Sequence, residues 1–170
     1  MNDSEILDGI IEREGGFVDH ASDKGGPTKY GITAATLSAH RGGTMVDATD
    51  VERLTIDEAR TIYRERYLLR PGFDKVTDDR LRALLVDWGV HSGPVNAIRG
   101  LQRALNVAPD GVLGPITLLA LPHLDQRAVF ARVLARRMRF IADILQRDPT
   151  QRVFAAGWIN RLSEFMEMMA

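Results

Sequence analysis

Apolar residues recur at three- and four-residue steps along most of this chain, and this spacing limits what it can fold into. Such steps place side chains on one face of a helix, whereas a half-buried strand needs alternation over roughly four to eight residues. No convincing alternating run occurs, and glycine-proline pairs such as Pro71-Gly72 and Gly93-Pro94 interrupt the helical pattern. The sequence therefore predicts a mainly α fold of amphipathic helices.

Composition excludes several kinds of function. A chain of 170 residues, 45% of them hydrophobic, is long enough for a sizeable core. Cysteine is absent, which excludes disulfides, thiolate metal sites and cysteine nucleophiles. The four histidines are scattered without the pairing of a zinc site, so we expect no metal and no cofactor. Neither a signal peptide nor a membrane span is evident, so we expect synthesis in the cytoplasm.

Charge is distributed unevenly along the chain. Residues 1–98 carry 12 Lys and Arg against 17 Asp and Glu, whereas residues 99–170 carry 10 against 6. The acidic first part argues against nucleic acid as a partner, and the basic second part suits an anionic polymer such as peptidoglycan. Arg132, Arg136 and Arg139 lie off the apolar face of one predicted helix. A solvated face is the commoner explanation, and contact with outer-membrane lipopolysaccharide is the alternative.

The clearest functional signal is the junction between the first predicted helix and a glycine-rich segment, residues 15–33. Asp3 or Ser4 is expected to cap this helix. Glu14 falls on the same face as four apolar residues, namely Ile6, Leu7, Ile10 and Ile11. A carboxylate on the dry side of a last turn feels desolvation and the negative end of the helix dipole, and both raise its pKa. Glu14 could then donate a proton, although it could equally be a frayed residue in water.

Residues 14–33 read E-G-G-F-V-D-H-A-S-D-K-G-G-P-T-K-Y-G-I-T, and this segment resembles the signature of glycoside hydrolase family 108. The family comprises phage-type N-acetylmuramidases of the lysozyme superfamily. Similar segments follow downstream, beginning at Leu54, Val86, Asp110 and Phe154. The sequence departs from the family's more usual Asn, Asp, Pro and Pro at four loop positions, namely Asp19, His20, Ala21 and Lys24.

The resemblance implies a lysozyme-like architecture in which two lobes have different functions. Residues 1–93 would form a compact helical catalytic lobe, and residues 94–170 a helical peptidoglycan-binding lobe packed against it. We expect a monomer that acts without a cofactor. Phage relatives imply release to the cell wall by a holin, and hence cell-wall lysis and antimicrobial action.

The resemblance also implies roles for individual residues. Glu14 would donate a proton to the leaving oxygen, Asp23 would be the second carboxylate, and Thr28 would orient water. Asp23 would either activate that water or stabilise the oxocarbenium-like charge. We assign substrate binding to five further residues, namely Gly25, Gly26, Tyr30, His91 and Asn96.

The expected reaction is hydrolysis of the β-1,4 bond between N-acetylmuramic acid and N-acetylglucosamine in bacterial peptidoglycan. Two alternatives remain open. A lytic transglycosylase would use the same lone glutamate and release a 1,6-anhydro sugar. A non-catalytic peptidoglycan-binding or secretion-accessory protein would use the basic part of the chain alone.

Overall fold

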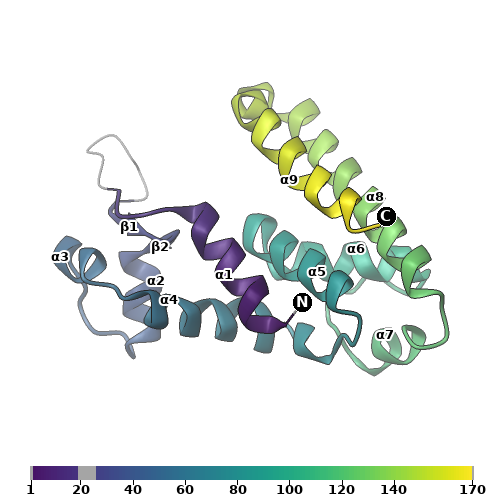
Figure 1. Ribbon diagram of the computed structural model, residues 1–170, viewed down its shortest axis with the longest axis horizontal. Coiled ribbons are helices and arrows are strands. Elements are labelled where there is room, and N and C mark those ends of the chain that lie inside the picture. The colour runs from purple at the N-terminus through teal and green to yellow at the C-terminus, as the bar shows by residue number, and fades with distance from the viewer. Residues whose placement is uncertain (1, 19–25, 170) are drawn as a thin grey trace. The chain divides into compact units, whose positions relative to one another are not determined.

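The structure is a computed structural model that describes residues 2–18 and 26–169, and over these residues it is mainly helical with one two-stranded sheet. This confirms the predicted fold class. The chain divides into two compact units, Met1–Leu69 and Arg70–Ala170. Figure 1 shows the helices of each unit along the chain.

The first unit is built around a helix and a short hairpin. Its elements are α1 (Asp3–Glu14), β1 (Thr28–Lys29), β2 (Ile32–Thr33), α2 (Ala34–His40), α3 (Ala48–Glu52), α4 (Ile56–Tyr63) and the π-helical η1 (Arg64–Leu69). β1 and β2 pair antiparallel, with Thr28 opposite Thr33. α1 packs against α4, and the apolar stripe of α1 is buried as predicted.

Capping residues set the helix boundaries in this unit. Asn2, and not Asp3 or Ser4, caps α1: its side chain accepts a hydrogen bond from the Glu5 backbone, and the Glu5 side chain accepts one from the Asn2 backbone. The predicted cap was wrong because the two-way box needs a glutamate three residues after the cap, which only Asn2 has. Thr33 caps α2 in the same way that Thr55 caps α4.

The second unit is a set of packed helices. Its elements are the 3-10 turn η2 (Phe73–Lys75), α5 (Asp79–Ser92), α6 (Pro94–Leu105), α7 (Pro115–Ala120), α8 (Gln126–Arg147), the 3-10 helix η3 (Pro149–Phe154) and α9 (Ala155–Glu167). α5, α6 and α8 pack against one another, and α9 returns alongside α8 after η3 (Figure 1). A Cβ on Gly100 would lie 2.3 Å from the Trp88 ring, so glycine lets α6 approach α5 closely.

The predicted break at Gly93-Pro94 is present as a sharp turn. Gly93 has a φ of 85°, and Pro94 is the first residue of α6. The compact units, however, divide between Leu69 and Arg70, so α5 and α6 belong to the same unit. The functional boundary between residues 93 and 94 therefore stays a prediction.

A buried ion cluster joins three helices of the second unit. The Asp87 carboxylate on α5 accepts hydrogen bonds from Arg137 Nη2 of α8 at 2.5 Å and from Arg161 Nε of α9 at 2.7 Å. Asp87 and Arg137 are each 1% exposed. Burial by itself raises the pKa of Asp87, but the two arginines outweigh it and hold that pKa below the ordinary aspartate value.

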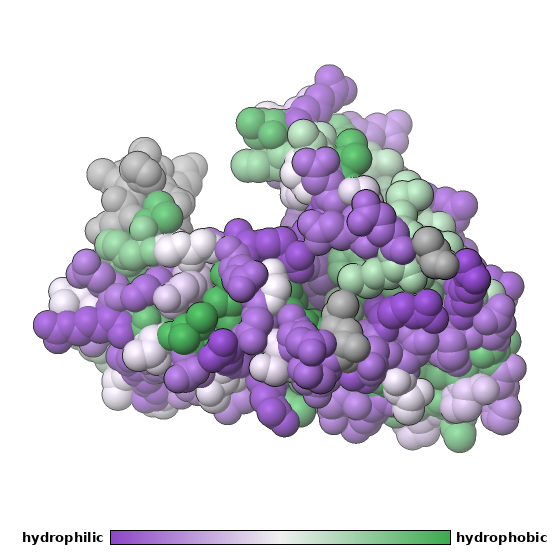
Figure 2. All heavy atoms as spheres, in the orientation of Figure 1, coloured by the Kyte–Doolittle hydropathy of each residue, from purple (hydrophilic) through white to green (hydrophobic). Residues whose placement is uncertain are grey.

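Large hydrophobic side chains are exposed on η3. Figure 2 shows them at the end of the second unit where η3 lies, and Val153 and Phe154 of η3 are 77% and 54% exposed. No helix in the described part of the chain is both long and apolar enough to cross a membrane.

Candidate active site

Glu14 is the last residue of α1, and its side chain is exposed. This contradicts the expectation of a carboxylate on the dry side of the helix. Burial along α1 stops at Ile11, because the helix ends at Glu14 and its last turn extends past the part that packs on the core. Gly15 follows with a φ of 79°, a conformation that glycine adopts without steric cost.

The β1–β2 hairpin is attached to this end of α1. Its two turn residues, Tyr30 and Gly31, have φ values of 53° and 69°, the positive signs that a type I′ turn requires. The Tyr30 backbone N–H donates to the Gly15 carbonyl at 3.0 Å. Thr28 and Val18 exchange two backbone hydrogen bonds, at 2.8 and 2.9 Å. These hydrogen bonds therefore hold the described chain on either side of residues 19–25 next to Glu14.

Gly31 is the point at which three groups meet. A Cβ at this position would lie 2.8 Å from Glu14 Oε2 and 2.7 Å from the Tyr63 hydroxyl oxygen, closer than real Cβ atoms approach other atoms. Tyr63, buried on α4, donates its hydroxyl hydrogen to the Tyr30 carbonyl at 2.9 Å. The missing side chain of Gly31 thus leaves room for the Glu14 carboxylate beside the turn.

The structure brings some of the predicted residues together. Glu14, Thr28 and Tyr30 all belong to this junction, and Gly26, with a φ of 70°, precedes β1. Asp23 and Gly25 lie outside the described residues, as do the four loop positions that depart from the family pattern.

Gly31 and Tyr63 had no predicted site role. Gly31 stands in the glycine-rich segment, which was the available signal, whereas Tyr63 follows the apolar spacing of its helix and resembles a core residue.

His91 and Asn96 lie in the second unit, at the junction of α5 and α6. His91 Nδ1 is 2.7 Å from Ser92 Oγ, and its ring meets the Trp158 ring edge-on at 5.1 Å. Burial, followed by the charges of Arg137 and Arg161, lowers the pKa of His91. Asn96 Nδ2 donates to the Ser92 carbonyl at 2.7 Å. Both side chains therefore have partners that fix their positions within the unit.

The chemistry available at the junction is that of a carboxyl group, hydroxyls and backbone. Among the described residues, no group of three or more His, Asp or Glu side chains is arranged to hold a metal ion. A carboxyl group that reaches solvent beside a glycine-rich turn can exchange a proton with a bound substrate.

Two family models match the chain. Residues 7–93 match the model described as glycosyl hydrolase 108, and residues 96–163 match the model described as a predicted peptidoglycan domain. Among solved structures, the chain is similar to SagA of Brucella abortus, with 32% identity and a TM-score of 0.81. That alignment covers 98% of this chain and 92% of the other. No curated protein matches the chain significantly.

The fold, the junction at Glu14 and these matches define the class of protein. The chain belongs to the glycosyl hydrolase 108 family, as its sequence motifs implied, and carries a peptidoglycan-binding region after the hydrolase region. It is accordingly a glycoside hydrolase, and peptidoglycan is its substrate polymer.

Proposed function

We propose that the protein is an N-acetylmuramidase in which Glu14 donates the proton to the leaving oxygen. The observation that carries this proposal is the convergence of the Glu14 carboxylate, the Gly31 backbone and the Tyr63 hydroxyl. A proton donor must be held in one position relative to the bond it cleaves, and the turn beside Glu14 supplies that support. The convergence lies within the part of the chain that matches the hydrolase family.

The remaining catalytic roles follow from the chemistry of glycoside hydrolysis. Asp23 is the second carboxylate, and Thr28 orients the attacking water. Two carboxyl groups about 5 Å apart favour a covalent intermediate and retention, whereas a wider gap admits water and favours inversion. We assign sugar binding to Tyr30, Gly25 and Gly26, with His91 and Asn96 as further substrate contacts.

The cellular role that fits this activity is wall lysis. The protein would be made in the bacterial cytoplasm as a monomeric phage or prophage endolysin and would reach the wall after holin-type release. The basic second part of the chain would hold peptidoglycan, and the arginines of α8 offer a second candidate contact, with outer-membrane lipopolysaccharide.

Product analysis on purified sacculi tests the proposal. A muramidase releases fragments whose new reducing end is N-acetylmuramic acid, whereas a lytic transglycosylase releases 1,6-anhydro ends without reducing power. Chromatography and mass spectrometry of the soluble fragments distinguish the two. New reducing ends on N-acetylglucosamine, or binding to sacculi without any released fragment, would contradict the proposal.

A further inference from the structure

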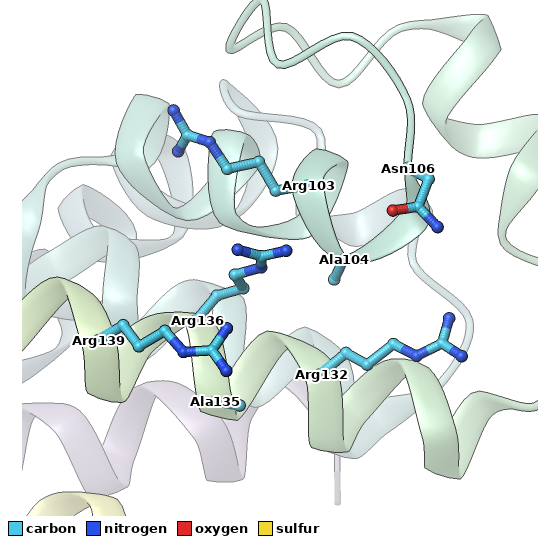
Figure 3. A pocket seen from close by; sticks show the side chains of 7 residues that line it. All are labelled: Arg103, Ala104, Asn106, Arg132, Ala135, Arg136 and Arg139. Carbon is cyan, nitrogen blue, oxygen red and sulfur yellow. The ribbon is translucent and has the colours of Figure 1, made fainter.

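Arginines from two packed helices line a pair of adjoining cavities in the second unit. One cavity has a volume of about 390 Å³ and the other about 320 Å³. Both are lined by Arg103 of α6 and by Arg136 and Arg139 of α8; Arg99 and Arg147 complete the larger and Arg132 the smaller. Figure 3 shows the smaller cavity, with Arg136 extending from α8 toward α6. We call the two cavities together the arginine groove.

The described part of the protein offers few counter-charges to the arginine groove, namely Asp143 in its lining and Asp110, whose pKa is lowered first by a hydrogen bond from the Val112 backbone and in smaller part by the charge of Arg99. None of its six guanidinium groups makes a hydrogen bond or an ion pair with a described residue. Asp143 is the one carboxylate among the described lining residues, and it is exposed. Some arginines outside the groove are paired, since Arg41 binds Glu58 and Arg60 binds Asp8. Like charges gathered in a concave surface repel one another and attract an anion from outside.

The groove is also built on a rigid base. Trp88 of α5 and Phe140 of α8 line the larger cavity, and their ring centroids are 5.7 Å apart. Gly100 lets α6 lie against the Trp88 ring. Arg99 and Arg103 are exposed on α6, and they line the groove together with the arginines of α8. The arginines therefore stand on packed helices, which fix the spacing of the backbone positions from which their side chains extend.

We propose that the arginine groove binds carboxylates of the peptide stems of peptidoglycan. Guanidinium groups bind carboxylates through two parallel hydrogen bonds, and free carboxylates of the stems are the negative charges of an otherwise neutral glycan. The α6 and α8 residues that line the groove fall within the part of the chain that matches the predicted peptidoglycan domain. The inference takes the identity of the polymer from the proposed function. It does not depend on the proposed reaction at Glu14.

The form of the groove favours this ligand over a phosphorylated lipid surface. A helix that lies on a membrane presents a convex face on which basic residues flank apolar ones. The arginines here instead line a concavity between two helices, a form that suits a narrow chain with separated carboxylates better than a bilayer surface. The smaller cavity is lined by arginine, alanine and asparagine, and so offers no apolar side chain of the size that inserts into a bilayer.

Binding to sacculi of two chemical states tests the inference. The protein carries Glu14→Gln throughout, so that sacculi stay intact during sedimentation. In this background, Arg103→Gln with Arg136→Gln removes one charge from each helix. The matched control is Arg70→Gln with Arg152→Gln, which removes two charges from exposed arginines of the same unit outside the groove. Circular dichroism verifies that both variants fold.

On untreated sacculi, the groove variant should bind at least about tenfold more weakly than the control. A tenfold change in affinity corresponds to roughly 1.4 kcal/mol, and each lost charge-assisted hydrogen bond supplies a substantial part of that free energy. On sacculi whose carboxylates have been capped as amides, both variants should bind equally weakly. Equal binding by both variants to untreated sacculi would overturn the inference. So would a persistent difference on capped sacculi.

Binding to vesicles with and without lipopolysaccharide tests whether the groove binds a lipid phosphate instead of a stem carboxylate. If the groove variant loses vesicle binding but keeps sacculus binding, the ligand is a lipid phosphate and the inference is wrong. Release of reducing sugar by the protein with native Glu14 is measured separately. An absence of release together with carboxylate-dependent binding would contradict the muramidase proposal and leave the arginine groove intact.

Discussion

The Glu14 carboxylate is placed by its neighbours and not by burial, since the side chain is exposed and lies beside Gly31. Replacement by Gln keeps the size of the side chain and removes the transferable proton. We expect Glu14→Gln to lower kcat on sacculi by about 10²- to 10⁴-fold, the usual contribution of a general acid. Stability should stay within about 0.5 kcal/mol of the parent, as is usual for exposed positions.

Glu12→Gln is the matched control for this variant. Glu12 is exposed on the same helix and makes no hydrogen bond or ion pair with a described residue. Its replacement should leave the release of reducing sugar unchanged. Near-normal lysis by Glu14→Gln, or an equal loss in both variants, would remove Glu14 from the mechanism.

Gly31 provides a second test at this scale. Alanine there would place a methyl group less than 3 Å from both Glu14 Oε2 and the Tyr63 hydroxyl oxygen, on a residue whose φ is 69°. We expect Gly31→Ala to displace the carboxylate, to lower kcat by at least about tenfold and to destabilise the fold by about 1–3 kcal/mol. Gly16→Ala is the control, because a Cβ there meets no atom within 4 Å. Kinetics and urea unfolding should show the effect at Gly31 only.

The sequence identified Glu14 as the candidate acid but did not identify the contribution of Tyr63 to this candidate site. Glu14 was identifiable because a helical stripe and a glycine-rich motif meet there. Whether Glu14 is buried or exposed was left open, since spacing shows the face of a helix but not where the neighbouring layer ends. The apolar spacing of α4 favours a core position for Tyr63, which is buried, but its hydroxyl hydrogen bond to Tyr30 depends on how α4 packs beside the hairpin, which local patterns do not encode.

At the scale of elements, the Asp87 cluster holds α5, α8 and α9 together. Replacing Asp87 by Asn would remove the carboxylate that the buried Arg137, 1% exposed, shares with Arg161. Removing one partner of a buried pair costs about 3–5 kcal/mol, so Asp87→Asn should lower the free energy of unfolding by that amount. Asp74→Asn, a change at an exposed aspartate of the same unit, should have little effect. Urea denaturation measures both, and equal stabilities would show that the cluster is not a stabilising contact.

The same cluster predicts a dependence of stability on pH. The two arginines hold the pKa of Asp87 below its value in an unfolded chain, so its ionised form stabilises the fold at neutral pH. This contribution is present above the unfolded pKa, about 3.9, and is lost as the pH falls through the lower folded value. The stability difference between the wild type and Asp87→Asn should therefore be constant from pH 7 to about 5 and shrink below about 4. A difference that grows on acidification would contradict this assignment.

Helix ends were largely predictable from the sequence, whereas the ion pairs that connect different helices were not. The predicted break at the Gly93-Pro94 pair is confirmed, and Thr33 and Thr55 cap their helices through hydrogen bonds accepted from the backbone three residues away. Asp87 gave no comparable signal, because its partners lie on helices far along the chain and an acidic residue inside an apolar stripe does not indicate which arginine will reach it.

At the scale of the whole molecule, the family matches and the compact units divide the chain differently. The hydrolase match ends at residue 93, whereas the first compact unit ends at Leu69. α5 therefore belongs to the hydrolase region by sequence and to the helical second unit by packing. Charge patterning gave the basic character of the second part, but the groove became visible only when α6 and α8 were seen to pack with their arginines on one side.

The Glu14 junction and the arginine groove belong to different compact units, and this gives the last prediction. Tyr63→Phe removes the hydroxyl that donates to the Tyr30 carbonyl, and we expect it to lower kcat about 3- to 10-fold with little change in KM, because it loosens the turn beside the acid. Arg103→Gln with Arg136→Gln should instead raise KM on sacculi and leave cleavage of short, stem-free glycans unchanged.

The two sets of residues belong to different compact units, so their effects should be independent. In the triple variant, the losses in kcat/KM on sacculi should multiply, with free energies that add to within about 0.5 kcal/mol. The two parent variants measured side by side serve as the controls. A combined loss well below the product would mean that stem binding and proton donation act through one shared step, and that the arginines position the bond to be cleaved as well as retaining the polymer.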